Sequence, residues 1–196
     1  MLKFDRRGLL AELDASTPWR RVVFVASCVE VLIPGYARFS ELEGVGDTAL
    51  LRDTLDAVWA EAGRPGSESV AASVLPPDDA IEALLPAEED WNDWAPQAED
   101  AVAALMYLTR LIRGGDIAAA AYAAARSYSA FDEFVARRLE LRAVDHAARV
   151  ILLSAPEIQA ELRRQRDVLR RLAESADGDP ETLAAVRDDA RADRWG

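Results

Sequence analysis

The most apolar stretch of this chain, residues 22–33, is interrupted by a single carboxylate, that of Glu30. A helix over residues 19–33 would be apolar nearly all the way round, which is typical of an element surrounded by other helices. The run is too short to cross a bilayer, which takes about 20 apolar residues. Glu30 within it, and the charged residues before it, do not fit a signal peptide. The sequence therefore predicts a central helix of a folded domain.

A carboxylate in such a helix needs a partner, because burying an unpaired charge is costly. In the structural interpretation, Glu30 forms an ion pair or accepts hydrogen bonds from backbone donors of another helix. In the alternative, Glu30 is a general base or a ligand in a pocket. We favour the structural interpretation, and the sequence leaves the partner of Glu30 open.

Nearly all of the remaining sequence is typical of helices. It lacks the period-two alternation of strands, and proline and glycine separate its amphipathic segments. The predicted N-caps are Thr17, Asp47, Asp116 and Asp179. The expected helices cover about residues 4–13, 19–33, 36–42, 48–62, 78–85, 96–113, 117–141, 156–173 and 180–192. We predict one all-α domain over residues 1–196 with about seven to nine helices, a long loop at about 63–77, and the terminal helix as a candidate extension.

Composition excludes several classes of function. The net charge is -12, with 8 basic and 20 acidic residues in positions 1–100 and 15 of each in the rest, so binding to nucleic acid is disfavoured. One histidine and one cysteine exclude the usual zinc sites, a ferritin-like di-iron site and an intrachain disulfide. His146 follows Asp145, but adjacent helical residues do not face each other, so they form no catalytic dyad. We predict no cofactor and a cytoplasmic location.

Paired aspartates support one enzyme hypothesis. All-helical nucleotide pyrophosphohydrolases hold Mg²⁺ with acidic pairs spaced i, i+3 on facing helices, and Asp53 with Asp56, and Asp90 with Asp93, have this spacing. A chain with this many acidic residues contains several such pairs by chance. Asp53 and Asp56 also lie on the face of their expected helix that should be exposed to solvent. We therefore predict no metal site. Only in the alternative interpretation, that of an enzyme, do these four aspartates bind Mg²⁺.

Two surface features are candidate partner-binding sites. Arg163, Arg166 and Arg170 share one face of the expected 156–173 helix, and Arg164 and Arg171 lie on a neighbouring strip. Such a face is commonly solvated, but it could complement the acidic first half within the fold or across a dimer, and we prefer the first. The arginines that precede it are Arg137, Arg138, Arg142 and Arg149. In the acidic loop 88–94, we expect Trp91 or Trp94 to enter the core; two exposed indoles would mark a partner site.

One set of motifs resembles a known family. Glu30, Pro34, Tyr36 and Phe39 are followed by the stretch from Gly44 to Asp47 and then by Asp56 and Trp59. This pattern resembles the YjaG-like family of bacterial proteins, a domain of unknown function, over about residues 9–175. The resemblance implies a compact, all-helical cytoplasmic domain and no particular reaction. It makes a candidate functional group of Glu30, Tyr36, Asp47, Asp56 and Trp59.

These observations predict a cytoplasmic interaction or regulatory protein without catalytic activity. The alternative is a Mg²⁺-dependent phosphohydrolase that uses clustered carboxylates. The sequence leaves an unknown protein partner open, and we expect no nucleic acid, no membrane, and either a monomer or a homodimer.

Overall fold

The computed structural model of the protein describes residues 1–141, 146–192 and 194–195, and within these residues it is all-α without a strand. Its α-helices are α1 (Arg6–Asp14), α2 (Pro18–Glu30), α3 (Ile33–Glu43), α4 (Thr48–Ala62), α5 (Asp78–Glu82), α6 (Ala95–Gly114), α7 (Ile117–Arg138), α8 (His146–Ser154), α9 (Pro156–Glu174) and α10 (Pro180–Arg191), with 3₁₀ turns η1 (Ala72–Val74) and η2 (Glu88–Asp90). Helices α2 and α3 form one helical span, Pro18–Glu43, so the described residues hold nine helical units, within the predicted range.

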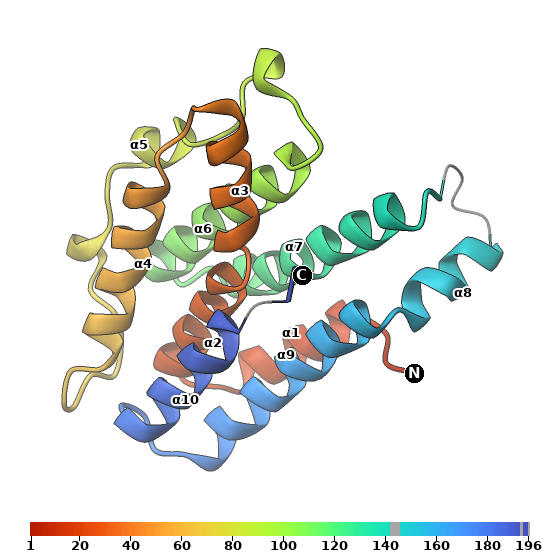
Figure 1. Ribbon diagram of the computed structural model, residues 1–196. Helices are drawn as coiled ribbons and strands as arrows, with labels where there is room; N and C mark the ends of the chain where they lie inside the picture. Colours follow the sequence, from red (N-terminus) through yellow and green to blue (C-terminus); the bar gives the residue numbers. More distant parts are fainter. Residues whose placement is uncertain (142–145, 193, 196) are drawn as a thin grey trace.

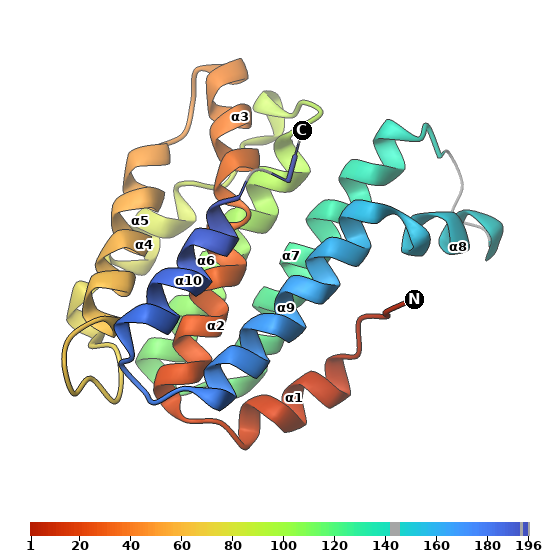
Figure 2. The same ribbon diagram turned by 60° about the horizontal axis from the view of Figure 1, so that its bottom comes forward.

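Helix α2 is the central helix that the sequence predicted. Figure 1 shows it in the middle of the molecule, between α4 on one side and α7 and α9 on the other. Every residue from Val22 to Glu30 is buried. Figure 2 shows α10 lying along α2. The helices share one continuous hydrophobic core that surrounds α2.

The span Pro18–Glu43 is the one helix in the described residues that is long and apolar enough to cross a membrane by length and composition. Within the protein, 83% of its most apolar window is buried. Core helices pass the same test, so this is weak evidence for a membrane segment.

The end of α2 differs from the expectation. The sequence predicted a helix to residue 33, whereas α2 ends at Glu30 and α3 begins at Ile33. The cause is Pro34, which has no N–H to donate to the carbonyl of Glu30 one turn earlier. The chain therefore turns at residues 31–32, and Pro34 lies in the first turn of α3, where a missing N–H is tolerated.

The predicted helix starts are confirmed by their caps. Each capping side chain accepts a hydrogen bond from the backbone N–H three residues later, at 3.3 Å for Thr17, 2.8 Å for Asp47, 3.2 Å for Asp116 and 2.8 Å for Asp179. At the other ends of α3 and α6, Gly44 and Gly115 are left-handed, with φ of 69° and 66°.

Helix α8 was not predicted as a separate element. Its exposed Val150 and Ile151 obscure the amphipathic pattern. Arg142 and Asp145, which the sequence analysis considered, lie outside the described residues. His146 is exposed at the start of α8.

A polar network crosses the core between α2, α7 and α9. Arg164 Nε lies 2.6 Å from Glu161 Oε2, and Arg164 Nη1 donates to Ser27 Oγ at 3.1 Å. Glu161 Oε1 accepts from Ser127 at 2.7 Å and Gln165 at 2.8 Å. All of these side chains are buried. Arg164, which the sequence placed on a strip beside the basic face of this helix, is therefore buried and faces α2.

The network keeps Glu161 ionised. Burial by itself would raise the pKa of the Glu161 carboxyl, but the charge and hydrogen bonds of Arg164 outweigh burial and lower this pKa. The neighbouring Cys28 responds in the opposite way, since burial raises the pKa of its thiol to about 11 against the effect of Arg164. Cys28 is consequently a protonated, unreactive core residue at neutral pH.

We expect Arg164→Met to lower the free energy of unfolding by about 3–5 kcal/mol, because it leaves the Glu161 carboxylate buried without a cation. The double variant with Glu161→Leu should lose less, since neither charge remains. Urea denaturation followed by circular dichroism measures both. Equal losses in the single and double variants would contradict the coupling.

Candidate functional site

Glu30 is held by side chains from two other helices. Its side chain is fully buried at the end of α2. From α4, Trp59 Nε1 donates to Glu30 Oε2 at 2.8 Å, and Arg52 Nη1 donates to Oε1. From α10, Arg191 Nε donates to Oε1 at 2.9 Å, and this bond raises the pKa of the Arg191 guanidinium. Both carboxylate oxygens are therefore occupied by charged or indole donors.

A second carboxylate completes this cluster. Asp56 of α4 accepts from Arg187 Nη2 and, at 3.4 Å, from Arg191 Nη2. The Arg187 guanidinium also lies over the ring of Trp59, 5.6 Å from its centroid. Three guanidiniums thus neutralise two carboxylates where α2, α4 and α10 meet. The geometry is that of a structural ion cluster, which makes α10 an integral part of the core.

Tyr36 and Asp47 belong to a different contact. The hydroxyl of Tyr36 donates to the carbonyl of Leu84 at 3.1 Å and accepts from the backbone N–H of Asp47 at 3.2 Å. Gly46 lies against this hydroxyl with φ of 84°, and a Cβ there would approach it to 2.6 Å. The candidate group therefore divides into the ion cluster around Glu30 and a hydrogen-bonded turn around Tyr36.

The four candidate metal-binding aspartates do not converge. Asp53 and Asp93 are exposed, and Asp56 belongs to the ion cluster. Asp90 lies in η2 and is partly buried. Among the residues that the structure describes, no three His, Cys, Asp or Glu side chains are grouped so that they could hold a metal ion.

The two tryptophans of the acidic loop have different environments. Trp94 packs on the core, with its ring centroid 5.8 Å from that of Phe134 and 6.1 Å from that of Trp195. This confirms the prediction that at least one indole is inserted. Trp91 is 54% exposed. Asn92 donates to Glu43 at 2.6 Å and so connects the loop to the end of α3.

The basic face of α9 is exposed. Arg170 pairs at 3.3 Å with Asp167 and Glu174 of its own helix, and Arg163 and Arg166 lie in solvent. The expectation that this face complements the acidic half within the fold is therefore wrong. Other arginines of residues 101–196 form ion pairs with acidic side chains of residues 1–100. These arginines include Arg113, Arg126, Arg187 and Arg191.

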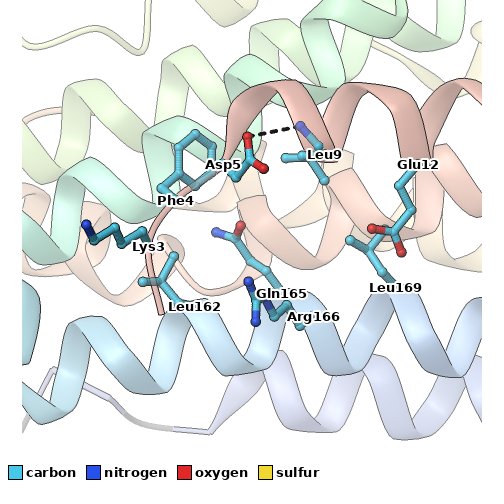
Figure 3. Close-up of a pocket in the computed structure, with 10 residues that line it drawn as sticks. Lys3, Phe4, Asp5, Leu9, Glu12, Leu162, Gln165, Arg166 and Leu169 are labelled. Atoms are coloured by element: carbon cyan, nitrogen blue, oxygen red, sulfur yellow. Dashed lines mark hydrogen bonds between the residues drawn. The ribbon is translucent and has the colours of Figure 1, made fainter. Parts of the chain in front are cut away.

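A cavity of ≈ 430 Å³ lies between α1 and α9 (Figure 3). Its apolar lining consists of Phe4, Leu9, Leu162 and Leu169, and its charged lining of Lys3, Asp5, Glu12 and Arg166. Figure 3 shows the amide of Gln165 in the floor, between the two helices. This amide is fixed in place, because its nitrogen donates inward to Glu161 at 2.8 Å.

A second hollow of ≈ 210 Å³ continues the first along the same two helices. It shares Glu12 and Leu169 with the cavity and extends to Arg20 and Leu172. We call the two hollows together the α1–α9 groove. Leu162, Leu169 and Leu172 follow helical spacing along α9 and give the floor its apolar part, which the amide of Gln165 interrupts.

Sequence analysis found only Arg166 of the groove residues. The available signal was the position of Arg166 between Leu162 and Leu169 on one side of a helix. Lys3, Asp5 and Glu12 gave no signal, because nothing in the sequence shows that α1 lies against α9.

A further buried carboxyl, Asp100, lies between α6 and α7. Its Oδ1 accepts from Arg126 Nη1 at 2.9 Å, and its Oδ2 has no hydrogen-bond partner within the described structure. Burial raises the pKa of Asp100 from 3.8 to about 7 against the opposing effect of Arg126, and Glu133 and Glu99 add to the rise.

Glu30→Ala should lower the free energy of unfolding by about 3 kcal/mol or more, because it leaves the guanidiniums of Arg52 and Arg191 without their buried counter-charge. Glu30→Gln should cost less, since its amide oxygen still accepts a hydrogen bond. Thermal and urea unfolding measure both. An unchanged melting temperature in Glu30→Ala would show that the cluster does not hold α10.

The raised pKa of Asp100 should make the free energy of unfolding depend on pH. Since its folded-state pKa lies above the unfolded value, its protonation stabilises the fold fully below about pH 4, and this contribution is lost as the pH rises through 7. Asp100→Asn should therefore raise the free energy of unfolding by about 1–3 kcal/mol at pH 8, and the gain should shrink at pH 5. A gain that is the same at both pH values would contradict the assignment.

Comparison with known proteins places the chain in a family. The sequence matches the family described as "Protein of unknown function (DUF416)" over residues 9–195. The fold is similar to the crystal structure, at 1.91 Å resolution, of a DUF416 family protein from Shewanella baltica OS155, with a TM-score of 0.79, 22% sequence identity and 92% of each chain covered. A search of curated proteins found no match. Because the family model spans almost the whole sequence, this chain belongs to the DUF416 family.

Proposed function

We propose that this chain is a cytoplasmic, YjaG-like bacterial interaction protein that binds a partner segment in the α1–α9 groove. The observation that carries the proposal is the lining of the groove, in which apolar side chains lie beside the cations of Lys3 and Arg166 and the carboxylates of Asp5 and Glu12. A volume of ≈ 430 Å³ is in the range of pockets that hold one large side chain or a small ligand.

The charges define the chemistry of the partner. The lining also holds two carboxylates of the same chain, Glu12 and Asp5, of which Asp5 accepts a hydrogen bond from the N–H of Gly8 at 3.0 Å as the cap of α1. Lys3, Arg163 and Arg166 form no ion pair within 4 Å among the described residues. The partner that fits is therefore a segment with an aromatic or branched apolar side chain next to carboxylates, because the first fills the floor and the second pairs with the rim.

The buried ionic groups support the same proposal. Glu30 and Glu161 each have their oxygens engaged by donors from the protein, which is the arrangement of groups that hold helices together. The groove, in contrast, presents charged side chains to solvent above an apolar surface. We therefore place the function of the protein at the groove.

Two short fluorescent peptides test the proposal. Each carries one tryptophan, surrounded by glutamates in the first and by lysines in the second. Fluorescence anisotropy should show binding of the acidic peptide, and Arg166→Glu should weaken this binding by about tenfold or more, which corresponds to about 1.4 kcal/mol. The matched control is Arg149→Glu, an exposed arginine on α8 outside the groove, which should leave binding unchanged. Equal binding of both peptides, or of neither, would contradict the proposal.

A further inference from the structure

The acidic loop of this chain has the chemistry that the groove accepts. Trp91 is 54% exposed, although its neighbour Trp94 packs on the core. The exposed carboxylates around Trp91 are those of Glu88, Glu89 and Asp93. Tryptophan is enriched at the centres of protein interfaces. The loop thus presents an apolar anchor surrounded by acids.

The loop is held in a form that presents this anchor. Asn92, which follows Trp91, donates to Glu43 and accepts from the backbone N–H of Trp94 at 2.6 Å. The ring of Trp94 lies under the Arg137 guanidinium, 5.4 Å away. Because Asn92 and Trp94 are fixed in this way, presenting the adjacent Trp91 to a partner costs less conformational entropy than it would on a free loop.

The loop cannot enter the groove of its own molecule. Figures 1 and 2 both show the segment around η2 at the end of the molecule opposite α1. An acidic loop of this sequence that occupies the groove would therefore come from another copy of the chain.

We propose that the α1–α9 groove binds Trp91 and the acidic loop of a second copy of this protein. This inference rests on the proposed function and names its partner. The indole lies on the floor of Phe4 and Leu162, and the loop carboxylates pair with Lys3 and Arg166. The contact is heterologous, since it joins two different surfaces, so each bound pair leaves one groove and one loop free for further copies.

The net charge limits the strength of this association. Two copies that each carry a net charge of -12 repel each other at long range, whereas the ion pairs between the acidic loop and the groove act only at short range. At about 0.15 M salt the Debye length is about 8 Å, so most of the long-range repulsion is screened. A single loop in a single groove is a small interface, so association requires high protein concentration.

Sedimentation velocity in about 0.15 M salt tests the inference. The average mass of the unmodified protein should rise with concentration. Trp91→Ala keeps the groove and lacks the anchor, whereas Arg166→Glu keeps the anchor and repels the acidic loop. Each variant alone should remain monomeric. A mixture of the two should form a one-to-one pair, because the loop of the Arg166→Glu chain can enter the intact groove of the Trp91→Ala chain.

Two controls make the result decisive. Arg149→Glu should associate like the unmodified protein, and circular dichroism should show that every variant is folded. The inference is overturned if both variants are monomeric and their mixture forms no pair. It is also overturned if both variants still associate like the unmodified protein. If the unmodified protein stays monomeric while the acidic peptide still binds, the inference fails and the proposed function stands. If the peptide also fails to bind, both fail.

Discussion

The rest of this fold depends on the burial of α2 together with the carboxylate at its end. A charge cannot lie in the core without compensation, so Glu30 requires the cations and the indole that α4 and α10 supply. At the other end of α2, Trp19 Nε1 donates to the carbonyl of Ala62 at 2.8 Å. Helices α2 and α4 are thus joined at both ends, and α10 is placed against them by the same carboxylate.

The polar network of α9 acts on another side of the same helix. Arg164 reaches Ser27 and Cys28 of α2, and it is itself neutralised by Glu161 one turn earlier. Buried pairs of this kind add less to stability than apolar packing of equal volume, but breaking one is costly. Their effect here is specificity, because only one orientation of α9 places Arg164 inward and leaves Arg163 and Arg166 outward.

This orientation of α9 also creates the surface that we assign to function. With Arg164 turned to the core, Leu162 and Leu169 lie at the boundary with α1, and Arg166 lies on the rim of the groove. The buried carboxylates of Glu30 and Glu161 are paired with donors inside the protein, whereas the charged side chains that line the groove are accessible to solvent. An interaction protein with no established reaction is consistent with this division, since fold alone does not define activity.

The sequence by itself determined the local structure. Most helix starts and ends follow from caps, glycines and prolines within a few residues, with α8 as the exception, and the apolar run identified α2 as central. The tertiary structure alone decided the partners of Glu30, which are 22, 29 and 161 residues away, and the burial of Arg164. It also decided the groove, which needs α1 beside α9. The physical reason is that helical periodicity fixes where a side chain points, whereas contacts between distant segments decide what covers it.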